Sequence, residues 1–370
     1  MATLSLASVG KVGKQARLLS PFFGRTVILP YMATRLRFGI LSTGNIARQF
    51  AAGIRQSLRC ELVCVGSRSL DTAKAFAAAQ QARRAFGSYE QVLADPEVDA
   101  IYIGLPNSMH HEWAIRSLRA GKHVLCEKPF AMSAAQSREM FAAADQTGKT
   151  LVEAFMYRSH PQTLKVLETI RSGAIGQVRL IRSSFCYKTT KIAGSIRFDA
   201  ALGGGALMDI GCYCIDFAQL ITGAAPGRVN ACAHLHESGV DDMTAGTMEF
   251  ADGTIGTFVC GMTAATNNSA YVCGTEGYIE IPVPWKPPVG AAQFTIAYGI
   301  RPRMDGPGAG AAPAGPQIIK VDADRDIYSF EADAFAAAVL DAAPPHMPRQ
   351  DTLSNMDLLD TLRKQIGVIH

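Results

Sequence analysis

Short apolar runs alternate with amphipathic stretches from residue 35 to residue 155, and this alternation constrains the fold more than any other feature. The strand-like runs are 35–41, 60–67, 99–105, 122–128 and 150–155. The helical stretches between them are 44–54, 69–80, 88–95, 110–121 and 133–148. In the last of these, Ser133 is placed to cap the helix and Gly148 to end it. Strands that alternate with helices predict βαβ units and a parallel sheet.

The pattern changes near residue 155. Two helical stretches, 160–172 and 204–222, precede a series of strands, and two more, 326–341 and 350–366, end the chain. The strands are 177–187, 228–236, 244–250, 254–261, 269–274 and 278–283, with hairpin-like turns between several of them. This pattern predicts a second domain of α+β type with a large, mostly antiparallel sheet. Helices would cover one face, leaving the other available to a partner.

The domain organisation follows from these patterns. We expect an N-terminal extension at 1–34, an α/β parallel-sheet domain at 35–155, a substrate and oligomerisation domain at 156–348 and a C-terminal helix at 349–370. The stretch 305–316, "DGPGAGAAPAGP", is of low complexity and predicts a loop.

Composition excludes several classes of function. The net charge of +4 is small and its basic residues are scattered, which argues against nucleic-acid binding. No apolar run reaches the roughly 18 residues of a membrane span. The nine cysteines are odd in number and show neither C-x-x-C pairs nor zinc-ligand spacing, so we expect reduced, buried thiols and no metal site.

The first 34 residues differ from the rest because they hold four basic residues and no acidic one. A transit-like targeting segment, a disordered extension and a start codon assigned too early, with Met32 as the natural start, all fit this composition. We expect a cytoplasmic protein, with organellar targeting by residues 1–34 left open.

The stretch "GILSTGNIA" (39–47) joins the first strand to the first helix. The dinucleotide template G-x-G-x-x-G/A falls on Ser42, Gly44 and Ala47, so only the middle glycine is kept. That glycine lets a pyrophosphate approach the backbone, and the Ser42 hydroxyl could bind a phosphate. The alternative is an ordinary tight turn between strand and helix.

The second strand ends in "VGSRS" (65–69), where an NAD enzyme usually carries an acidic residue for the ribose 2′-hydroxyl. Here Ser67 and Arg68 occupy the position, and both suit a 2′-phosphate. The stretch therefore favours NADP over NAD, and the alternative is a solvated loop arginine.

The stretch "HVLCEKPFAM" (123–132) ends a buried strand with two adjacent charges followed by proline. Adjacent strand residues point to opposite sides. If Lys128 faces the ligand crevice at the carboxyl ends of the strands, Glu127 faces away and acts as a structural partner. Pro129 fixes the backbone after the lysine, and a cis bond would hold this turn.

A second unusual stretch is "LGGGALMDIGCYCID" (202–216), in which three glycines precede a helix. Asp209 and Tyr213 are four residues apart and share a helix face. An aspartate accepts hydrogen bonds from substrate hydroxyls and a tyrosine exchanges a proton, so the pair suits a pocket rim. A helix-start acid and a partly buried tyrosine are the alternative.

These stretches, together with "AIYIGLPNSMHHEWAIRSLRAGKHVLCEKP" and "VEAFMYRSHPQ", resemble the Gfo/Idh/MocA family of NAD(P)-dependent oxidoreductases over about residues 35–368. The chain is most similar to the branch with NADP-dependent D-xylose dehydrogenases, dihydrodiol dehydrogenases and glucose–fructose oxidoreductase. The resemblance implies a Rossmann domain followed by a sheet domain that often dimerises. It also implies that Lys128 and Tyr213 are the catalytic pair.

The resemblance gives the lysine a chemical purpose. Lowering the pKa of a tyrosine from about 10 by about three units takes roughly 4 kcal/mol. A lysine cation about 4 Å away supplies an electrostatic free energy of about this size at an effective dielectric near 20.

We expect NADP-dependent oxidation of a polyhydroxylated substrate, such as D-xylose at C1 to a lactone. The alternatives are a trans-dihydrodiol dehydrogenase and a non-catalytic NADP-binding regulator.

Further residues complete the predicted site. Pro106 and Asn107 are expected on the nicotinamide side, and His110 either caps a helix or contacts the cofactor. Arg158 either binds substrate or forms an ion pair at the domain interface, and Trp285, between prolines, is expected to be exposed and to stack on substrate.

The predicted cofactor-binding set is Ser42, Thr43, Gly44, Asn45, Ile46, Ser67, Arg68, Pro106, Asn107, His110 and Glu127. The predicted substrate-binding set is Arg158, Asp209 and Trp285, with Asp209 also assigned a catalytic role. The expected partners are a sugar or diol and further copies of the chain, in a homodimer or a higher homo-oligomer.

Overall fold

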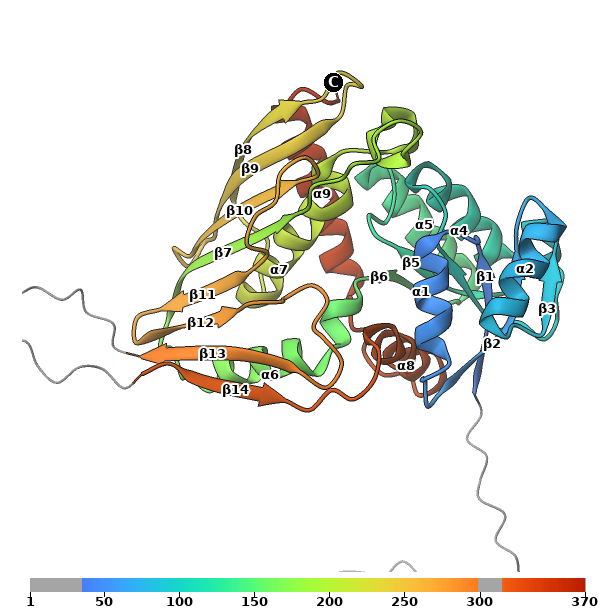
Figure 1. Ribbon diagram of the computed structural model, residues 1–370, viewed down its shortest axis with the longest axis horizontal. Helices are drawn as coiled ribbons and strands as arrows, with labels where there is room; N and C mark the ends of the chain where they lie inside the picture. The colour runs from blue at the N-terminus through green and yellow to red at the C-terminus, as the bar shows by residue number, and fades with distance from the viewer. Residues whose placement is uncertain (1–34, 299–314, 370) are drawn as a thin grey trace, which may run out of the picture. The chain divides into compact units, whose positions relative to one another are not determined.

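The computed structural model describes residues 35–298 and 315–369 (Figure 1). The N-terminal segment 1–34 and most of the predicted loop at 305–316 lie outside the described residues. The predictions made for those stretches therefore stay predictions.

The first sheet has six parallel strands in the order β3-β2-β1-β4-β5-β6. The order reverses between β1 and β4, which is where ligands bind in sheets of this kind. The strands are β1 Leu36–Leu41, β2 Cys60–Gly66, β3 Arg84–Phe86, β4 Ala100–Ile103, β5 His123–Glu127 and β6 Leu151–Ala154. The helices are α1 Asn45–Ile54, α2 Leu70–Gln80, α3 Tyr89–Ala94, α4 His110–Arg119 and α5 Ala134–Thr147, with a short 3₁₀ turn η1 at Asn107–Met109. The predicted parallel-sheet domain is confirmed.

Local capping explains several helix boundaries in this domain. Ser69 and Ser88 accept hydrogen bonds from first-turn amides of α2 and α3. Ser133 accepts from the Gln136 amide at the start of α5, and Gly148 ends that helix with φ +64°. Both boundaries of α5 are therefore as the sequence predicted.

The second sheet has eight strands in the order β14-β13-β12-β11-β7-β10-β9-β8. All neighbouring strands pair antiparallel except β7 and β10, which are parallel, so the sheet is mixed and not a simple meander. Three strands were not predicted from the sequence, namely β3, β13 and β14. The strands are β7 Val178–Cys186, β8 Arg228–Leu235, β9 Asp241–Glu249, β10 Ile255–Gly261, β11 Ala270–Gly274, β12 Gly277–Ile281, β13 Ala292–Tyr298 and β14 Gln317–Val321.

Three helices pack on one face of this sheet. α6 contacts β13 and β14, α7 contacts β7 and β10, and α9 contacts β8. The segments of this half are η2 Met156–Ser159, α6 Pro161–Arg171, η3 Ile196–Phe198, η4 Ala200–Leu202, the π-helical turn η5 Leu207–Gly211, α7 Cys212–Thr222, α8 Ile327–Leu340 and α9 Arg349–Gln365. Among the described residues, the run Ala200–Thr222 is apolar enough to span a membrane by length and composition alone, but 72% of its most apolar part is buried inside the fold. We therefore interpret it as a core helix.

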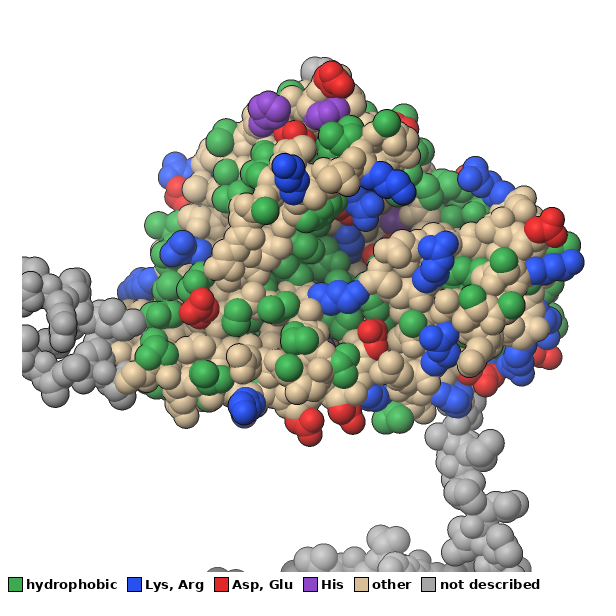
Figure 2. Space-filling model, in the orientation of Figure 1, with side chains coloured by type: hydrophobic (Ala, Val, Ile, Leu, Met, Phe, Trp, Pro, Cys, Tyr) green, Lys and Arg blue, Asp and Glu red, His purple; other side chains and the backbone are tan. Residues whose placement is uncertain are grey.

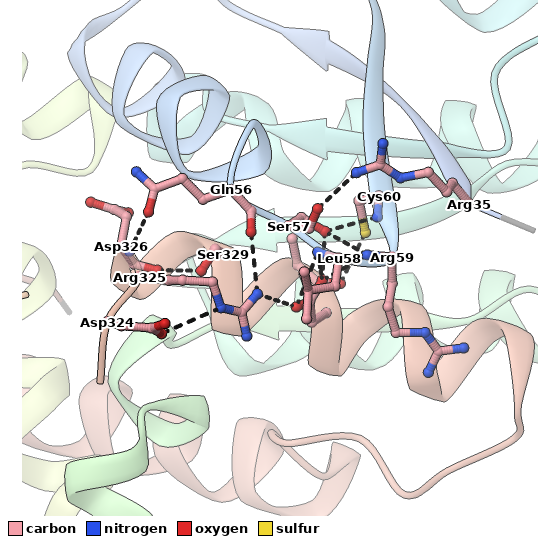
Figure 3. Close-up of polar contacts among 12 residues, drawn as sticks. Arg35, Gln56, Ser57, Leu58, Arg59, Cys60, Asp324, Arg325, Asp326 and Ser329 are labelled. Atoms are coloured by element: carbon pink, nitrogen blue, oxygen red, sulfur yellow. Dashed lines mark hydrogen bonds and ion pairs between the residues drawn. The ribbon is translucent and has the colours of Figure 1, made fainter. Parts of the chain in front are cut away.

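Helix α8 returns to the first domain and packs against α1 (Figure 1). The Phe335 ring on α8 lies 5.7 Å from the Phe38 ring on β1. A polar network fixes its start to the segment before β2, where Arg325 donates to the Gln56 carbonyl over 3.2 Å (Figure 3). Asp333 on α8 accepts hydrogen bonds from the Ser57 hydroxyl at 2.5 Å. The parallel-sheet domain is thus completed by a helix from near the end of the chain.

Candidate active site

The turn between β1 and α1 fits a dinucleotide pyrophosphate. Gly44 begins the helix without a side-chain cap, and no acidic residue lies in the first turn of α1. The first amides of a helix have no partner within it, so those of α1 point toward an approaching ligand. A Cβ on Gly44 would meet only the Ser42 hydroxyl, at 3.2 Å, so the glycine keeps space open toward the ligand side. Thr43 is partly buried, whereas Gly44 and Asn45 are exposed.

Ser42 occupies the position of the first template glycine in an unusual backbone conformation. Its φ is +135°, in the region that favours glycine. Its hydroxyl accepts a hydrogen bond from the Gly44 amide over 3.0 Å. This leaves the hydroxyl proton available to a phosphate, and the φ explains why the template carries glycine here.

The end of β2 places Ser67 and Arg68 beside this turn. Ser67 is 8% exposed and its amide donates to the Phe86 carbonyl over 3.1 Å. Arg68 is exposed, and within the described ranges it forms no ion pair. The guanidinium is therefore not committed to a carboxylate of the fold.

Lys128 follows the last residue of β5, and the Lys128–Pro129 bond is cis, as the sequence suggested. Its ammonium donates to the Asp209 carbonyl over 2.6 Å and lies 3.4 Å from the Asp209 carboxylate. Burial alone would lower the pKa of Lys128, but Asp209 raises it above the usual value. The lysine is therefore a cation at the carboxyl edge of the parallel sheet.

Glu127 points away from Lys128 into the interior, as the alternation of strand residues predicted. It is 5% exposed and accepts a hydrogen bond from the Tyr102 hydroxyl. Burial raises its pKa above the usual value. This placement fits a structural partner, so the assignment of Glu127 to the cofactor-binding set does not follow from the geometry.

Asp209 is the centre of the site. Its carboxylate accepts from the Tyr187 hydroxyl over 2.8 Å and from the Arg197 guanidinium over 2.7 Å, in addition to the contact with Lys128. Burial would raise the pKa of Asp209, but Lys128 and Arg197 hold it below the usual value. Asp209 is therefore an anion between two cations and a phenol.

The position of Asp209 depends on an irregular helix start. It lies on η5, one π-helical turn before α7. Such turns are frequent at functional sites because they re-aim side chains within a helix. Arg197 comes from the loop between β7 and η5, and Asn107 of the first domain donates to the Gly203 carbonyl over 2.8 Å beside it. These contacts join the two domains around the site.

Tyr213 lies close to Lys128, with the ammonium 5.0 Å from its ring centroid. Its hydroxyl, however, donates to the Met156 sulfur over 3.2 Å. Burial raises the pKa of Tyr213 well above the usual value, and Glu127 adds to this. The expected lowering of this pKa by Lys128 is therefore wrong for the arrangement described here, because the phenol faces a thioether in a closed aromatic environment.

Several secondary predictions are changed by the structure. His110 is 1% exposed, and its ring nitrogens lie 2.9 Å from the Leu105 and Pro129 carbonyls. It therefore links two strand ends and neither caps α4 nor reaches an open face. Pro106 and Asn107 are partly buried at the end of β4, on the side predicted for the nicotinamide.

Arg158 and Trp285 are both interior residues. The Arg158 side chain is 2% exposed and pairs with Asp216 at 2.6 Å and with Asp351 at 2.8 Å. This favours the alternative of an ion pair over substrate binding, with the Arg158 and Asp216 side chains both in the interior. Trp285 is 3% exposed, so the prediction of an exposed aromatic is wrong. Its ring packs against Phe185 at 5.7 Å and Tyr213 at 5.8 Å, which makes it part of the wall behind the site.

Tyr187 and Arg197 were missed by sequence reasoning. Tyr187 directly follows β7, and Arg197 lies on the short turn η3, whose sequence has no recognisable motif. The only local signal for the ion pair between Arg197 and Asp209 is that two residues of opposite charge lie on either side of a glycine run.

The space-filling view shows a hollow between the two sheets, with Lys and Arg side chains at its rim (Figure 2). The parallel sheet carries a dinucleotide-binding turn after its first strand. Lys128 lies at the carboxyl edge of the same sheet and is held by Asp209 of the second domain. Together these features define an NAD(P)-binding oxidoreductase. Residues 36–155 match the "oxidoreductase family, NAD-binding Rossmann fold", and residues 163–280 match the "GFO/IDH/MocA C-terminal domain". The chain belongs to the Gfo/Idh/MocA family.

Curated relatives agree with this assignment. An uncharacterized oxidoreductase of Rhizobium meliloti is 35% identical over 89% of this chain and 96% of its own length. The trans-1,2-dihydrobenzene-1,2-diol dehydrogenase of Danio rerio is 30% identical over 90% of this chain and 98% of its own. That of Xenopus laevis is 37% identical over 69% and 78%.

Solved structures show the same architecture. A 3-ketoreductase from Actinomadura kijaniata, crystallised with NADP and TDP-benzene, has a TM-score of 0.79 and 31% identity, covering 90% of this chain and 98% of its own. Aldose-aldose oxidoreductase from Caulobacter crescentus has a TM-score of 0.79 and 25% identity, with the same coverage.

Proposed function

We propose that this oxidoreductase uses NADP to oxidise one hydroxyl of a polyhydroxylated substrate, an aldose such as D-xylose at C1, to give a lactone. The observation that carries the proposal is the cluster of Lys128, Tyr187 and Arg197 around the Asp209 carboxylate. Such a cluster offers both donors and an acceptor for neighbouring hydroxyl groups, which a sugar presents and an apolar substrate lacks.

Oxidation removes a hydride from carbon and a proton from the hydroxyl oxygen, leaving a C=O bond. When bound, the nicotinamide accepts the hydride. Lys128 would donate a hydrogen bond to the substrate oxygen and stabilise the negative charge that develops there. Tyr213 would turn its hydroxyl from Met156 toward Lys128, lose its own proton to solvent beside that cation and then, as the phenolate, take the proton of the substrate hydroxyl. Asp209 keeps Lys128 charged and in place throughout.

Exchange of Tyr213 for phenylalanine tests this role. We expect Tyr213→Phe to lower kcat at least about a hundredfold at neutral pH, because the group that takes the proton is lost. The Kd for NADP should stay near the wild-type value. Near-normal turnover would remove Tyr213 from the mechanism and leave Tyr187, which lies on the same carboxylate, as the phenol to test.

Lys128→Met gives a complementary test. We expect lower turnover and an upward shift in the alkaline rise of the pH–rate profile, because Tyr213, once its hydroxyl has turned away from Met156, no longer meets a cation that favours the phenolate. An unshifted profile with a normal rate would make Lys128 a structural residue that joins the domains through Asp209.

The preference for NADP is a separate proposal, supported by Ser67, by Arg68, which has no ion-pair partner among residues 35–298 and 315–369, and by the NADP found in the ketoreductase crystals. Charge-assisted hydrogen bonds to a 2′-phosphate contribute roughly 1.5–3 kcal/mol each. We expect kcat/KM for NADP to exceed that for NAD by at least about tenfold. Ser67→Asp combined with Arg68→Ala should erase this preference, and equal use of both cofactors by the wild type would refute it.

A second candidate is a trans-dihydrodiol dehydrogenase, favoured by the names of the relatives and by the aromatic side chains Phe185 and Trp285 behind the site. A third, of another class, is an NADP-binding regulator without catalysis. Absorbance at 340 nm with a panel of aldoses and trans-dihydrodiols separates the three. Reduction with sugars alone supports the first, with diols alone the second, and NADP binding without any turnover the third.

We also propose a homodimer formed through the sheet face that α6, α7 and α9 leave uncovered. Apolar side chains on the second sheet support it, because Leu235, Ile255 and Ile318 are 44%, 47% and 58% exposed. A monomer by light scattering at micromolar concentration would refute this proposal.

A further inference from the structure

The loop between β12 and β13 crosses from the second sheet to the cofactor-binding helix α1. Its sequence, "PVPWKPPVG" (282–290), holds four prolines that limit its conformations. Three further contacts anchor it. The Gln162 side chain donates to the Val283 carbonyl over 3.0 Å, the Trp285 indole donates to the Ser184 carbonyl over 2.9 Å, and the Gly290 amide donates to the Ala323 carbonyl over 2.7 Å.

Lys286 is the one charged residue of this loop and is exposed, between a buried Trp285 and a buried Pro287. Its ammonium donates to the side-chain oxygen of Gln49 on α1 and lies 5.3 Å from the Tyr328 ring centroid on α8. In the part of the chain that the structure describes, no carboxylate lies within ion-pair distance of it. A loop anchored by these contacts therefore brings a lysine cation to the side of α1, and among the described residues this cation has no carboxylate partner.

The position on α1 indicates the ligand. Gln49 is four residues after Asn45, the first residue of the helix, and this is about one turn, or roughly 6 Å along the axis. The unpartnered amides that would receive a pyrophosphate are in that first turn. Four flexible carbons allow the lysine head group to cover such a distance.

We propose that Lys286 binds the pyrophosphate of the dinucleotide, leaving Gln49 when the cofactor enters, so that the second domain contributes directly to cofactor binding. The inference rests on dinucleotide binding by this family and not on the proposed substrate or on the preference for NADP. The pyrophosphate is common to NAD and NADP, so Lys286 should affect both equally, in contrast to Ser67 and Arg68.

Binding of NAD and NADP to the protein without substrate tests this inference by calorimetry. We expect Lys286→Gln to raise both Kd values about five- to tenfold, with a smaller effect at high salt, where an exposed charge is screened. Lys286→Arg should restore most of the affinity. Lys320→Gln is the matched control, because Lys320 is an exposed lysine on β14, and it should leave both Kd values unchanged.

Gln49→Ala separates cofactor binding from a purely structural bridge between the domains. If Lys286 only held the domains together through Gln49, the two variants would weaken binding equally. If it binds pyrophosphate, Gln49→Ala frees the ammonium and leaves both Kd values equal to or lower than those of the wild type. This comparison holds even if Lys286→Gln lowers the melting temperature.

Tryptophan fluorescence adds a local readout. The chain has two tryptophans, so a Trp113→Phe background leaves Trp285, next to Lys286, as the only one. Oxidised NAD or NADP should change its emission when Lys286 is present and change it less in Lys286→Gln. Unchanged affinity in Lys286→Gln, a loss equal to that of Gln49→Ala, or a loss for NADP alone would each overturn the inference.

Discussion

Two glycine-containing turns border the active site and use their glycines in opposite ways. At 42–46, a Cβ on Gly44 would meet only a serine hydroxyl at 3.2 Å, so the missing side chain leaves space open. At 203–205, a Cβ on Gly204 would lie 2.5 Å from the Arg197 carbonyl oxygen and one on Gly205 would lie 2.3 Å from Asp241. The first turn leaves space for a ligand, whereas the second packs the chain against itself.

This difference shows that glycine runs near a functional site need not have the same purpose. Gly205 has φ +116° and lies against Asp241, which also accepts from the Leu207 amide at 2.8 Å and the Thr244 hydroxyl at 2.6 Å. The second turn therefore sets the start of η5, and with it the position of Asp209. Substitutions in the second turn should act on stability and those in the first on cofactor affinity.

Gly205→Ala should have the largest effect. A Cβ there meets a buried carboxylate and a backbone conformation unsuited to alanine, so we expect a loss of about 3–5 kcal/mol in the free energy of unfolding. Urea denaturation measures it. A loss of less than about 1 kcal/mol in the free energy of unfolding would mean that the 203–205 turn is not tightly packed, and the contrast between the two turns would then be wrong.

The pH dependence of stability sharpens the same comparison. Burial raises the pKa of Asp241 from 3.8 to about 6, while its hydrogen bonds oppose the shift. Below about pH 4 the Asp241 carboxyl is protonated in the folded and in the unfolded protein. Between about pH 4 and 6 it is protonated only in the folded protein. The free energy of unfolding should therefore fall by about 2–3 kcal/mol as the pH rises through this range. Asp241→Asn should remove this part of the pH dependence, and an identical profile in the variant would contradict the assignment.

Gly44→Ala should leave stability almost unchanged and weaken cofactor binding. The φ of −68° suits alanine, so we expect a stability change below about 1 kcal/mol. The added Cβ would lie where the pyrophosphate approaches the backbone, so Kd for both NAD and NADP should rise about tenfold. Calorimetry and thermal melting measure the two effects separately, and unchanged affinity would show that this turn does not bind the cofactor closely.

Ser42→Gly should have the smallest effect. Glycine relieves the strain of φ +135°, but the variant loses the hydrogen bond from the Gly44 amide and gains freedom in the unfolded chain. We expect the free energy of unfolding to rise by less than about 1 kcal/mol. A decrease, measured by urea denaturation, would mean that the serine hydroxyl outweighs the backbone strain.

The features that the sequence predicted correctly depend on local chemistry. The alternation of strands and helices, the Ser133 cap and the opposite directions of Glu127 and Lys128 follow from residues close together in the chain. The misassigned features depend on contacts between distant segments. Trp285 looks exposed between its prolines, but Phe185 and Tyr213 bury it, and Arg158 finds its partner Asp216 58 residues away. The parallel pairing of β7 with β10 has no local signal at all.

The return of α8 to the first domain has a consequence for synthesis of the protein on the ribosome. The surface of α1 that receives Tyr328 is complete at residue 54, but α8 begins only at Ile327. At about 5–20 residues per second, the roughly 170 residues between the end of β6 and α8 take on the order of ten to thirty seconds to translate. During that interval the nascent parallel-sheet domain carries an uncovered apolar strip, which makes it a substrate for chaperones that bind emerging chains. Nascent chains stalled before residue 327 should therefore bind such chaperones more strongly than chains stalled after residue 340.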